Sequence, residues 1–100
     1  MKIFDLVDAE GRVFAFEVPN GLLSRRGLAR VVGTIAGVRV RRTPRLFSWS
    51  REETFCEFEV DGQSFEAWEP FGDNSRYWIG PKPAQWCTQV ALVRAAFEQH

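Results

Sequence analysis

One β-hairpin pattern constrains the fold of this chain more than any other feature of its sequence. Two runs of alternating apolar and polar residues, 54–60 and 63–69, flank the dipeptide Asp61-Gly62. Asp-Gly between alternating runs is typical of a two-residue turn, and such a turn fixes which residues pair across the two strands. Counting outward from the turn assigns the side chains to two faces: Val60, Gln63, Phe58, Phe65, Cys56 and Ala67 share one face, and Glu59, Ser64, Glu57, Glu66, Phe55 and Trp68 share the other.

Two segments have the periodicity of amphipathic helices. Ser24 is a suitable N-cap for the first helix, because its hydroxyl can accept a hydrogen bond from the first turn. Apolar residues then recur at i, i+3, i+4 and i+7 as far as Ile35, and Gly37 is expected to end the helix. The second helix is expected over 84–98, with a buried stripe of Trp86, Val90, Val93 and Phe97.

The N-terminal segment 2–18 predicts a further hairpin. Its two halves alternate, and Gly11 can take the left-handed conformation that closes the turn. Phe4 and Leu6 are expected to share a face with Phe16, while the opposite face is also largely apolar. A second apolar face must either be covered or serve as a contact, so one partner expected for this chain is a second copy, bound through residues 2–18.

Strands at 38–42 and 76–79 complete the element order β-β-α-β-β-β-β-α. This order predicts an α+β fold, with two helices packed on one face of a mostly antiparallel sheet. The chain has 100 residues and is 45% hydrophobic, which is sufficient for a single compact domain over 1–100.

The formal net charge of zero is the sum of two blocks of opposite sign. Residues 21–51 contain arginines but no acid, and residues 52–75 contain acids but no base. Neutrality argues against a general nucleic-acid or membrane-surface protein. If the strand at 38–42 lies beside 54–60, its arginines relieve the repulsion between Glu57 and Glu66, which face each other across the hairpin.

The same charged face is the first candidate binding site. Phe55 and Trp68 lie on it by register, either packed under the 43–53 loop or exposed as an aromatic platform rimmed by charge. Trp and Arg are common anchors of protein interfaces. The candidate partner-binding residues are Arg39, Arg41, Phe55, Glu57, Glu59, Glu66 and Trp68.

Two other sites follow from the sequence. Polar and aromatic residues in 69–78 either form an ordinary turn or line a pocket for a small ligand or a hydrolytic reaction. Arginines from Arg25 to Arg51, with Phe47 and Trp49 between them, offer a nucleic-acid site, although no known motif is present. The candidate pocket residues are Glu69, Asp73, Asn74, Arg76 and Trp78.

Catalysis, metal binding and a cofactor find little support in the sequence. The only histidine is His100, so a catalytic triad has no base, and no P-loop or GxGxxG motif is present. Cys56 and Cys87 lie in apolar segments and are expected to be reduced thiols rather than a disulfide or a zinc site. No signal peptide or membrane-spanning run is apparent, so a cytoplasmic location is expected.

Together these patterns predict a small cytoplasmic protein without catalytic activity that binds another protein. An inhibitor, an immunity-type partner of a toxin and an adaptor all fit this description. The alternatives are a ligand-binding or hydrolytic protein that uses the 69–78 cluster, and a nucleic-acid binder that uses the arginine block.

Overall fold

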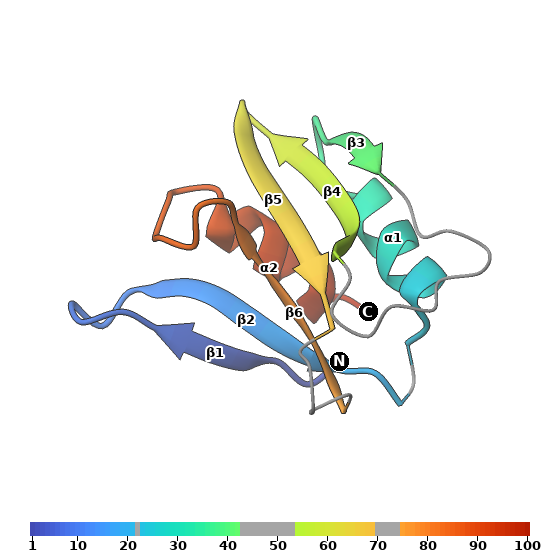
Figure 1. Ribbon diagram of the computed structural model, residues 1–100, viewed down its shortest axis with the longest axis horizontal. Helices are drawn as coiled ribbons and strands as arrows, with labels where there is room; N and C mark the ends of the chain where they lie inside the picture. Colours follow the sequence, from blue (N-terminus) through green and yellow to red (C-terminus); the bar gives the residue numbers. More distant parts are fainter. Residues whose placement is uncertain (22, 43–53, 70–74) are drawn as a thin grey trace.

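A six-stranded antiparallel sheet forms the centre of the part of the chain that the structure describes (Figure 1). The structure is a computed structural model that describes residues 1–21, 23–42, 54–69 and 75–100. Both the α+β class and the element order agree with the sequence-based prediction. The elements are β1 (Phe4–Val7), β2 (Val13–Pro19), α1 (Arg25–Gly33), β3 (Arg39–Arg42), β4 (Thr54–Val60), β5 (Gln63–Trp68), β6 (Arg76–Pro81) and α2 (Val90–Glu98).

The strand order in the sheet is β1-β2-β6-β5-β4-β3. Strands that are consecutive in sequence pair with each other, except β2 and β3, which α1 separates in the chain. β6 lies between β2 and β5. The N-terminal hairpin is therefore joined to the β3–β4–β5 meander through β6, as Figure 1 shows.

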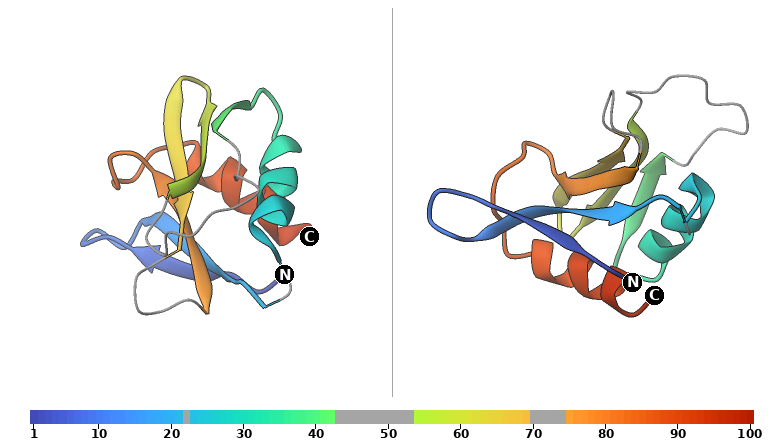
Figure 2. Two further views of the ribbon diagram at one scale, coloured as in Figure 1. Left: turned by 45° about the vertical axis from the view of Figure 1, so that its right-hand side comes forward. Right: turned by 90° about the horizontal axis from the view of Figure 1, so that it is seen from below.

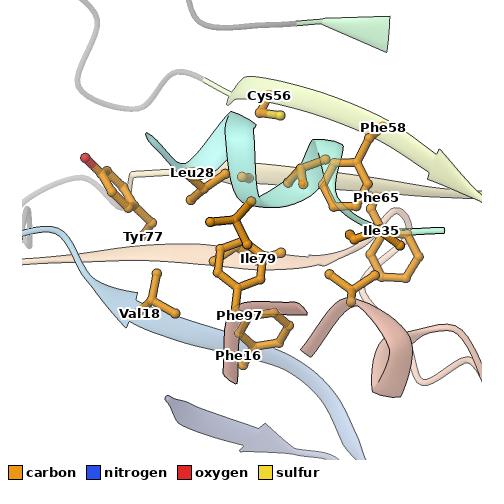
Figure 3. Packing of buried hydrophobic residues seen from close by; sticks show 14 of the residues in the cluster. Phe16, Val18, Leu28, Ile35, Cys56, Phe58, Phe65, Tyr77, Ile79 and Phe97 are labelled. Atoms are coloured by element: carbon orange, nitrogen blue, oxygen red, sulfur yellow. The ribbon is translucent and has the colours of Figure 1, made fainter. Parts of the chain in front are cut away.

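Both helices pack on one face of this sheet (Figure 2), as the sequence predicts. The apolar stripe of α1 and that of α2 meet the inward side chains of β2, β4, β5 and β6. Phe16 on β2 and Phe97 on α2 pack edge to face, with ring centroids 5.4 Å apart, and Figure 3 shows them in the same cluster as Leu28 and Phe65. Among the described residues, no helix is long and apolar enough to cross a membrane.

Helix α1 begins as the sequence indicates. The Ser24 hydroxyl accepts a hydrogen bond from the Gly27 amide at 3.0 Å, which satisfies one of the free N–H groups of the first turn. The predicted stripe is buried from Leu28 to Ile35. The helix itself ends at Gly33, and Gly37 lies beyond it with a positive φ of 74°.

The predicted start of the second helix is wrong. α2 begins at Val90, and Trp86 lies in the segment before it with 40% of its surface exposed. The Gln85 amide bonds to the Pro83 carbonyl and the Val90 amide to the Cys87 carbonyl, so this segment is built of turns. A tertiary contact holds Trp86 there, because the Arg12 guanidinium lies 4.7 Å from the centre of its ring.

The predicted faces of the N-terminal hairpin are also wrong. Phe4 pairs with Glu17 and Leu6 pairs with Ala15, so these β1 residues lie on the face away from the helices. An irregularity between Leu6 and Val7 shifts the register, which the alternation of the sequence does not reveal. The neighbouring Asp5 instead lies on the helix side, where it binds Arg94 of α2.

Candidate binding face

The sheet face away from α1 and α2 carries most of the candidate site residues (Figure 2). We call it the open face. Strand pairing places its side chains in rows that run across the sheet. The open face consists of Phe4 and Leu6 on β1, Ala15 and Glu17 on β2, Arg76, Trp78 and Gly80 on β6, Ser64, Glu66 and Trp68 on β5, Thr54, Glu57 and Glu59 on β4, and Arg39, Arg41 and Arg42 on β3.

A tryptophan pair forms the aromatic part of this face. Trp68 and Trp78 are register partners on β5 and β6, and their ring centroids lie 5.8 Å apart at an angle of 48°. Trp78 lies across its own strand, because a Cβ atom at Gly80 would come within 2.6 Å of Cη2 of Trp78 and 2.8 Å of Cβ of Ala15. Because Gly80 has no side chain, the Trp78 ring can pack directly against the backbone at this position. Both tryptophans remain half-buried and present part of their rings.

An arrangement of opposite charges lies beside the tryptophans. β3 pairs with β4, as the sequence analysis expected, and the Arg41 guanidinium binds Oε2 of Glu59 at 2.6 Å. A register shift at Arg41 places Arg42, rather than Arg41, opposite Glu57. The basic and acidic blocks of the sequence thus meet along this pair of strands. Each exposed pair contributes only about 0–1 kcal/mol, so its main effect is on which strands pair.

Glu57 and Glu66 face each other across β4 and β5, as the hairpin turn predicts. The Thr54 hydroxyl donates a hydrogen bond to Oε1 of Glu66 at 2.9 Å, which offsets part of the repulsion between the carboxylates. Thr54 was not among the predicted site residues, because a regular strand would place it on the opposite face, and only the irregularity between Thr54 and Cys56 brings it to the open face.

Phe55 does not belong to the open face, and its assignment there is wrong. The pairing of β4 with β5 skips Phe55, so that Thr54 faces Trp68 and Cys56 faces Ala67. This bulge turns the Phe55 ring toward the helices, where it is 1% exposed and packs 5.2 Å from the Tyr77 ring. Phe55 is therefore not part of an exposed platform, because it packs in the core. The segment 43–53, which was expected to lie over this face, is outside the described residues.

The opposite end of the open face is held by Arg76. Its guanidinium lies 3.5 Å from the centre of the Phe4 ring and 3.3 Å from Oε1 of Glu17. Stacking on an aromatic ring together with an ion pair orients the planar guanidinium. Arg76 therefore belongs to the β1–β2–β6 end of the open face.

Glu69 lies apart from the other members of the predicted 69–78 pocket. Its carboxylate binds Arg25 of α1 at 2.7 Å and Asn20 at 3.2 Å. These contacts attach the start of α1 to the end of β5, and they are on the helix side rather than on the open face with Arg76 and Trp78. Glu69 is therefore not brought together with Arg76 and Trp78, which share the open face, and Asp73 and Asn74 lie outside the described residues.

Tyr77 lies next to this ion pair in the core. Burial raises the pKa of the Tyr77 hydroxyl, and the nearby Glu69 carboxylate raises it further. The Tyr77 ring is 5% exposed, so the phenol is neutral and structural at physiological pH. The Arg25 guanidinium also lies 4.8 Å from the Phe55 ring, which makes this corner a packed junction.

The open face is hollowed where β4, β5 and the end of β6 meet. A depression of about 340 Å³ is lined by Arg41, Glu57, Phe58, Ser64, Phe65 and Lys82. Lys82 was not among the predicted site residues, because it lies beyond the strand that was expected at 76–79. Opposite charges side by side suit polar recognition more than the binding of a simple anion.

The predicted nucleic-acid block is divided by the fold. Arg25 binds Glu69, and Arg41 binds Glu59, while Arg26 and Arg30 are exposed on α1. Arg45, Phe47, Trp49 and Arg51 lie outside the described residues.

The two cysteines are free, and Cys56 is fully buried. Burial raises the pKa of its thiol to about 12, so it is not a nucleophile. Within the described ranges, no group of three or more potential ligands is placed to hold a metal ion. Comparisons of the chain with protein-family models, with curated proteins and with solved structures found no match.

Proposed function

We propose that this protein acts without catalysis and binds another protein through the open face. The observation that supports this most strongly is the Trp68–Trp78 pair, half-buried on a sheet face that neither helix covers. Tryptophan supplies a large contact area at a low cost in side-chain entropy, and it is enriched among residues that dominate binding energy. Gly80 and Ala15 fix Trp78 from below, so the platform is formed before the partner arrives.

The charges around the tryptophans indicate the chemistry of the partner. Arg39 on β3 and Lys82, which follows β6, make no ion pair with any described residue, and they are exposed. Glu57 on β4 lines the depression together with Lys82, and it likewise has no ion-pair partner in the described chain. The partner surface is therefore apolar at its centre, acidic where it meets Arg39 and Lys82, and basic where it meets Glu57.

An inhibitor, an immunity-type protein and an adaptor all work by this type of contact. The proposal also includes a cytoplasmic location, which the two free thiols support, because exposed or half-buried cysteines tend to oxidise outside the cell.

Site-specific photo-crosslinking in the source cell tests the proposal. A photoreactive phenylalanine replaces Ser64, which is exposed on the open face, or Arg26, which is exposed on α1 as the matched control. We expect one protein to be crosslinked from position 64 and not from position 26. Crosslinking of the same proteins from both positions, or from position 26 alone, contradicts the proposal.

The purified partner then allows a measurement of affinity. Replacing a central tryptophan of an interface typically costs 2 kcal/mol or more, so Trp68→Ala is expected to weaken binding by about 30-fold. Leu92→Ala removes an exposed apolar side chain from α2 and serves as the control, with an expected change of less than about twofold. Equal effects of the two substitutions would show that the open face is not the interface. Circular dichroism confirms that both variants are folded.

A further inference from the structure

A second apolar surface lies on the helix side of the sheet, where the β1–β2 hairpin approaches the segment before α2 (Figure 2). It contains a groove of about 410 Å³ with a largely apolar lining. Trp86, 40% exposed, forms one wall, and we call this hollow the Trp86 groove. Its apolar lining residues are Val13, Trp86, Cys87, Val90 and Ala91.

An arginine bound to two carboxylates borders the groove at one end. The Arg12 guanidinium stacks on Trp86 and lies 3.3 Å from Asp8 and 3.5 Å from Glu10. The amides of Glu10 and Arg12 both donate to Oδ1 of Asp8, and mainly these bonds hold the pKa of Asp8 below its ordinary value. Asp8 is therefore ionised at neutral pH, and the cluster carries one net negative charge.

At the other end of the groove, an arginine is again bound to two carboxylates. Arg94 on α2 binds both oxygens of Asp5, at 2.7 and 3.0 Å, and it also binds Glu98 one turn along the helix. One cation between two carboxylates again leaves one net negative charge. Arg12 and Arg94 thus line the groove, and each of them is bound to two carboxylates that lie just outside the lining, so the groove's surroundings carry a net negative charge.

A second hollow lies beside the first. It measures about 450 Å³, and it is lined by Asp8, Glu10 and Gln85. Arg12 and Trp86 line both hollows, so the stacked pair stands between the apolar and the acidic one. One peptide could place an apolar side chain in the first hollow and a Lys or Arg side chain in the second. The two residues would lie one turn apart in a helical peptide, or at alternate positions in an extended one.

We propose that the Trp86 groove binds a basic amphipathic segment of a partner protein, with an apolar anchor flanked by Lys or Arg. Charge complementarity selects this occupant, because the four carboxylates around the groove outnumber the two arginines in its lining. The same charge opposes a second copy of this chain. A twofold contact through the hairpin places like patches against each other, and here both carry a negative excess. The groove lies on the other side of the sheet from the tryptophan pair, so its binding is independent of the proposed function.

A peptide library displayed on phage tests this assignment. The immobilised wild-type protein selects from random peptides of about 15 residues, long enough for anchors at i, i+4 and i+7. The enriched peptides are synthesised and their affinities measured against two variants. Ala91→Arg fills the groove with a long cation, and Ala95→Arg makes the same change at an exposed position one turn further along α2, which does not line the groove.

The proposal expects enriched peptides with an apolar residue flanked by Lys or Arg. Their binding is expected to weaken at least tenfold with Ala91→Arg and less than about twofold with Ala95→Arg, and by about two- to fivefold with Glu10→Gln. Enrichment of acidic peptides, equal effects at positions 91 and 95, or no enrichment would overturn it. Sedimentation of the wild type as a dimer that Ala91→Arg alone dissociates would overturn it in favour of self-association.

Discussion

Gly80→Ala is the substitution whose effect the structure determines most directly. The added Cβ would lie 2.6 and 3.0 Å from Cη2 and Cζ2 of Trp78, and 2.8 Å from Cβ of Ala15. The contacts at 2.6 and 2.8 Å are too short to persist, and Ala15 and Gly80 are both buried, so either the indole ring or the strands must move. Overpacking of this kind costs about 1–3 kcal/mol. Alanine has a lower backbone entropy than glycine in the unfolded chain, which offsets about 0.5–1 kcal/mol of this cost. We therefore expect the free energy of unfolding to fall by about 1–2 kcal/mol.

A double-mutant cycle identifies the cause of that loss. Trp78→Phe removes the outer indole ring that carries Cη2 and Cζ2 but keeps an aromatic side chain. In this background Gly80→Ala retains only the clash with Ala15, so its cost is expected to fall below about 1 kcal/mol. Gly33→Ala is the control, because a Cβ there meets no atom within 4 Å. It should stabilise the end of α1 by up to about 1 kcal/mol.

Urea unfolding followed by far-ultraviolet circular dichroism measures all the variants of the cycle. For a domain of this length, 1 kcal/mol corresponds to a shift of about 4–8 °C in melting temperature, which gives an independent check. If Gly80→Ala leaves the free energy of unfolding of the wild type unchanged, or lowers it equally with phenylalanine at position 78, then the Trp78 ring does not pack against Gly80 as described. The tryptophan platform would then lose its structural support.

Three further results are expected. Ser24→Ala removes the cap from the Gly27 amide and should lower the free energy of unfolding by about 0.5–2 kcal/mol in urea titrations, and an unchanged midpoint would refute the cap. Because burial raises the pKa of Cys56 from 9.0 to about 12, the unfolded thiol ionises before the folded one. The contribution of this thiol to the free energy of unfolding is therefore fully present below pH 9 and is lost as the pH rises from 9 to about 12. If Cys56→Ala loses stability with the same slope over this pH range, the assignment to Cys56 is wrong. A thiol reagent at pH 8 should modify half-buried Cys87 rapidly and Cys56 only after unfolding, and equal rates would show that Cys56 is accessible.

The central hairpin was predictable from sequence because its information is local. Asp61 has a positive φ of 50° and Gly62 one of 78°, the conformation that a two-residue turn requires. The register that follows holds outward as far as Cys56 and Ala67. The basic and acidic blocks of the sequence correctly indicated that β3 pairs with β4, because the two strands are neighbours and their side chains lie in shared rows.

The errors arise where the strands are irregular. A bulge at Phe55 and a register shift after Leu6 each exchange the faces of the residues beyond them, and no alternation pattern contains this information. Trp86 fits a helical stripe by spacing, yet stacking with Arg12 of a distant hairpin holds it in a turn. The placement of Trp68 and of the charged residues on one face of the sheet was therefore predictable, while the positions of Phe55 and Trp86 depend on tertiary contacts.

The position of β6 in the sheet has a consequence for how the protein is made. A growing chain that has emerged only through β5 contains two separate sheet fragments, β1–β2 and β3–β4–β5, with no strand to connect them. Their inner strands β2 and β5 then present unpaired backbone edges, and α2 is not yet present to cover Phe16. Such intermediates are prone to aggregate, because open edges and apolar faces pair with other chains. The last quarter of the sequence thus converts two incomplete fragments into one cooperative unit, and folding on the ribosome must wait for it.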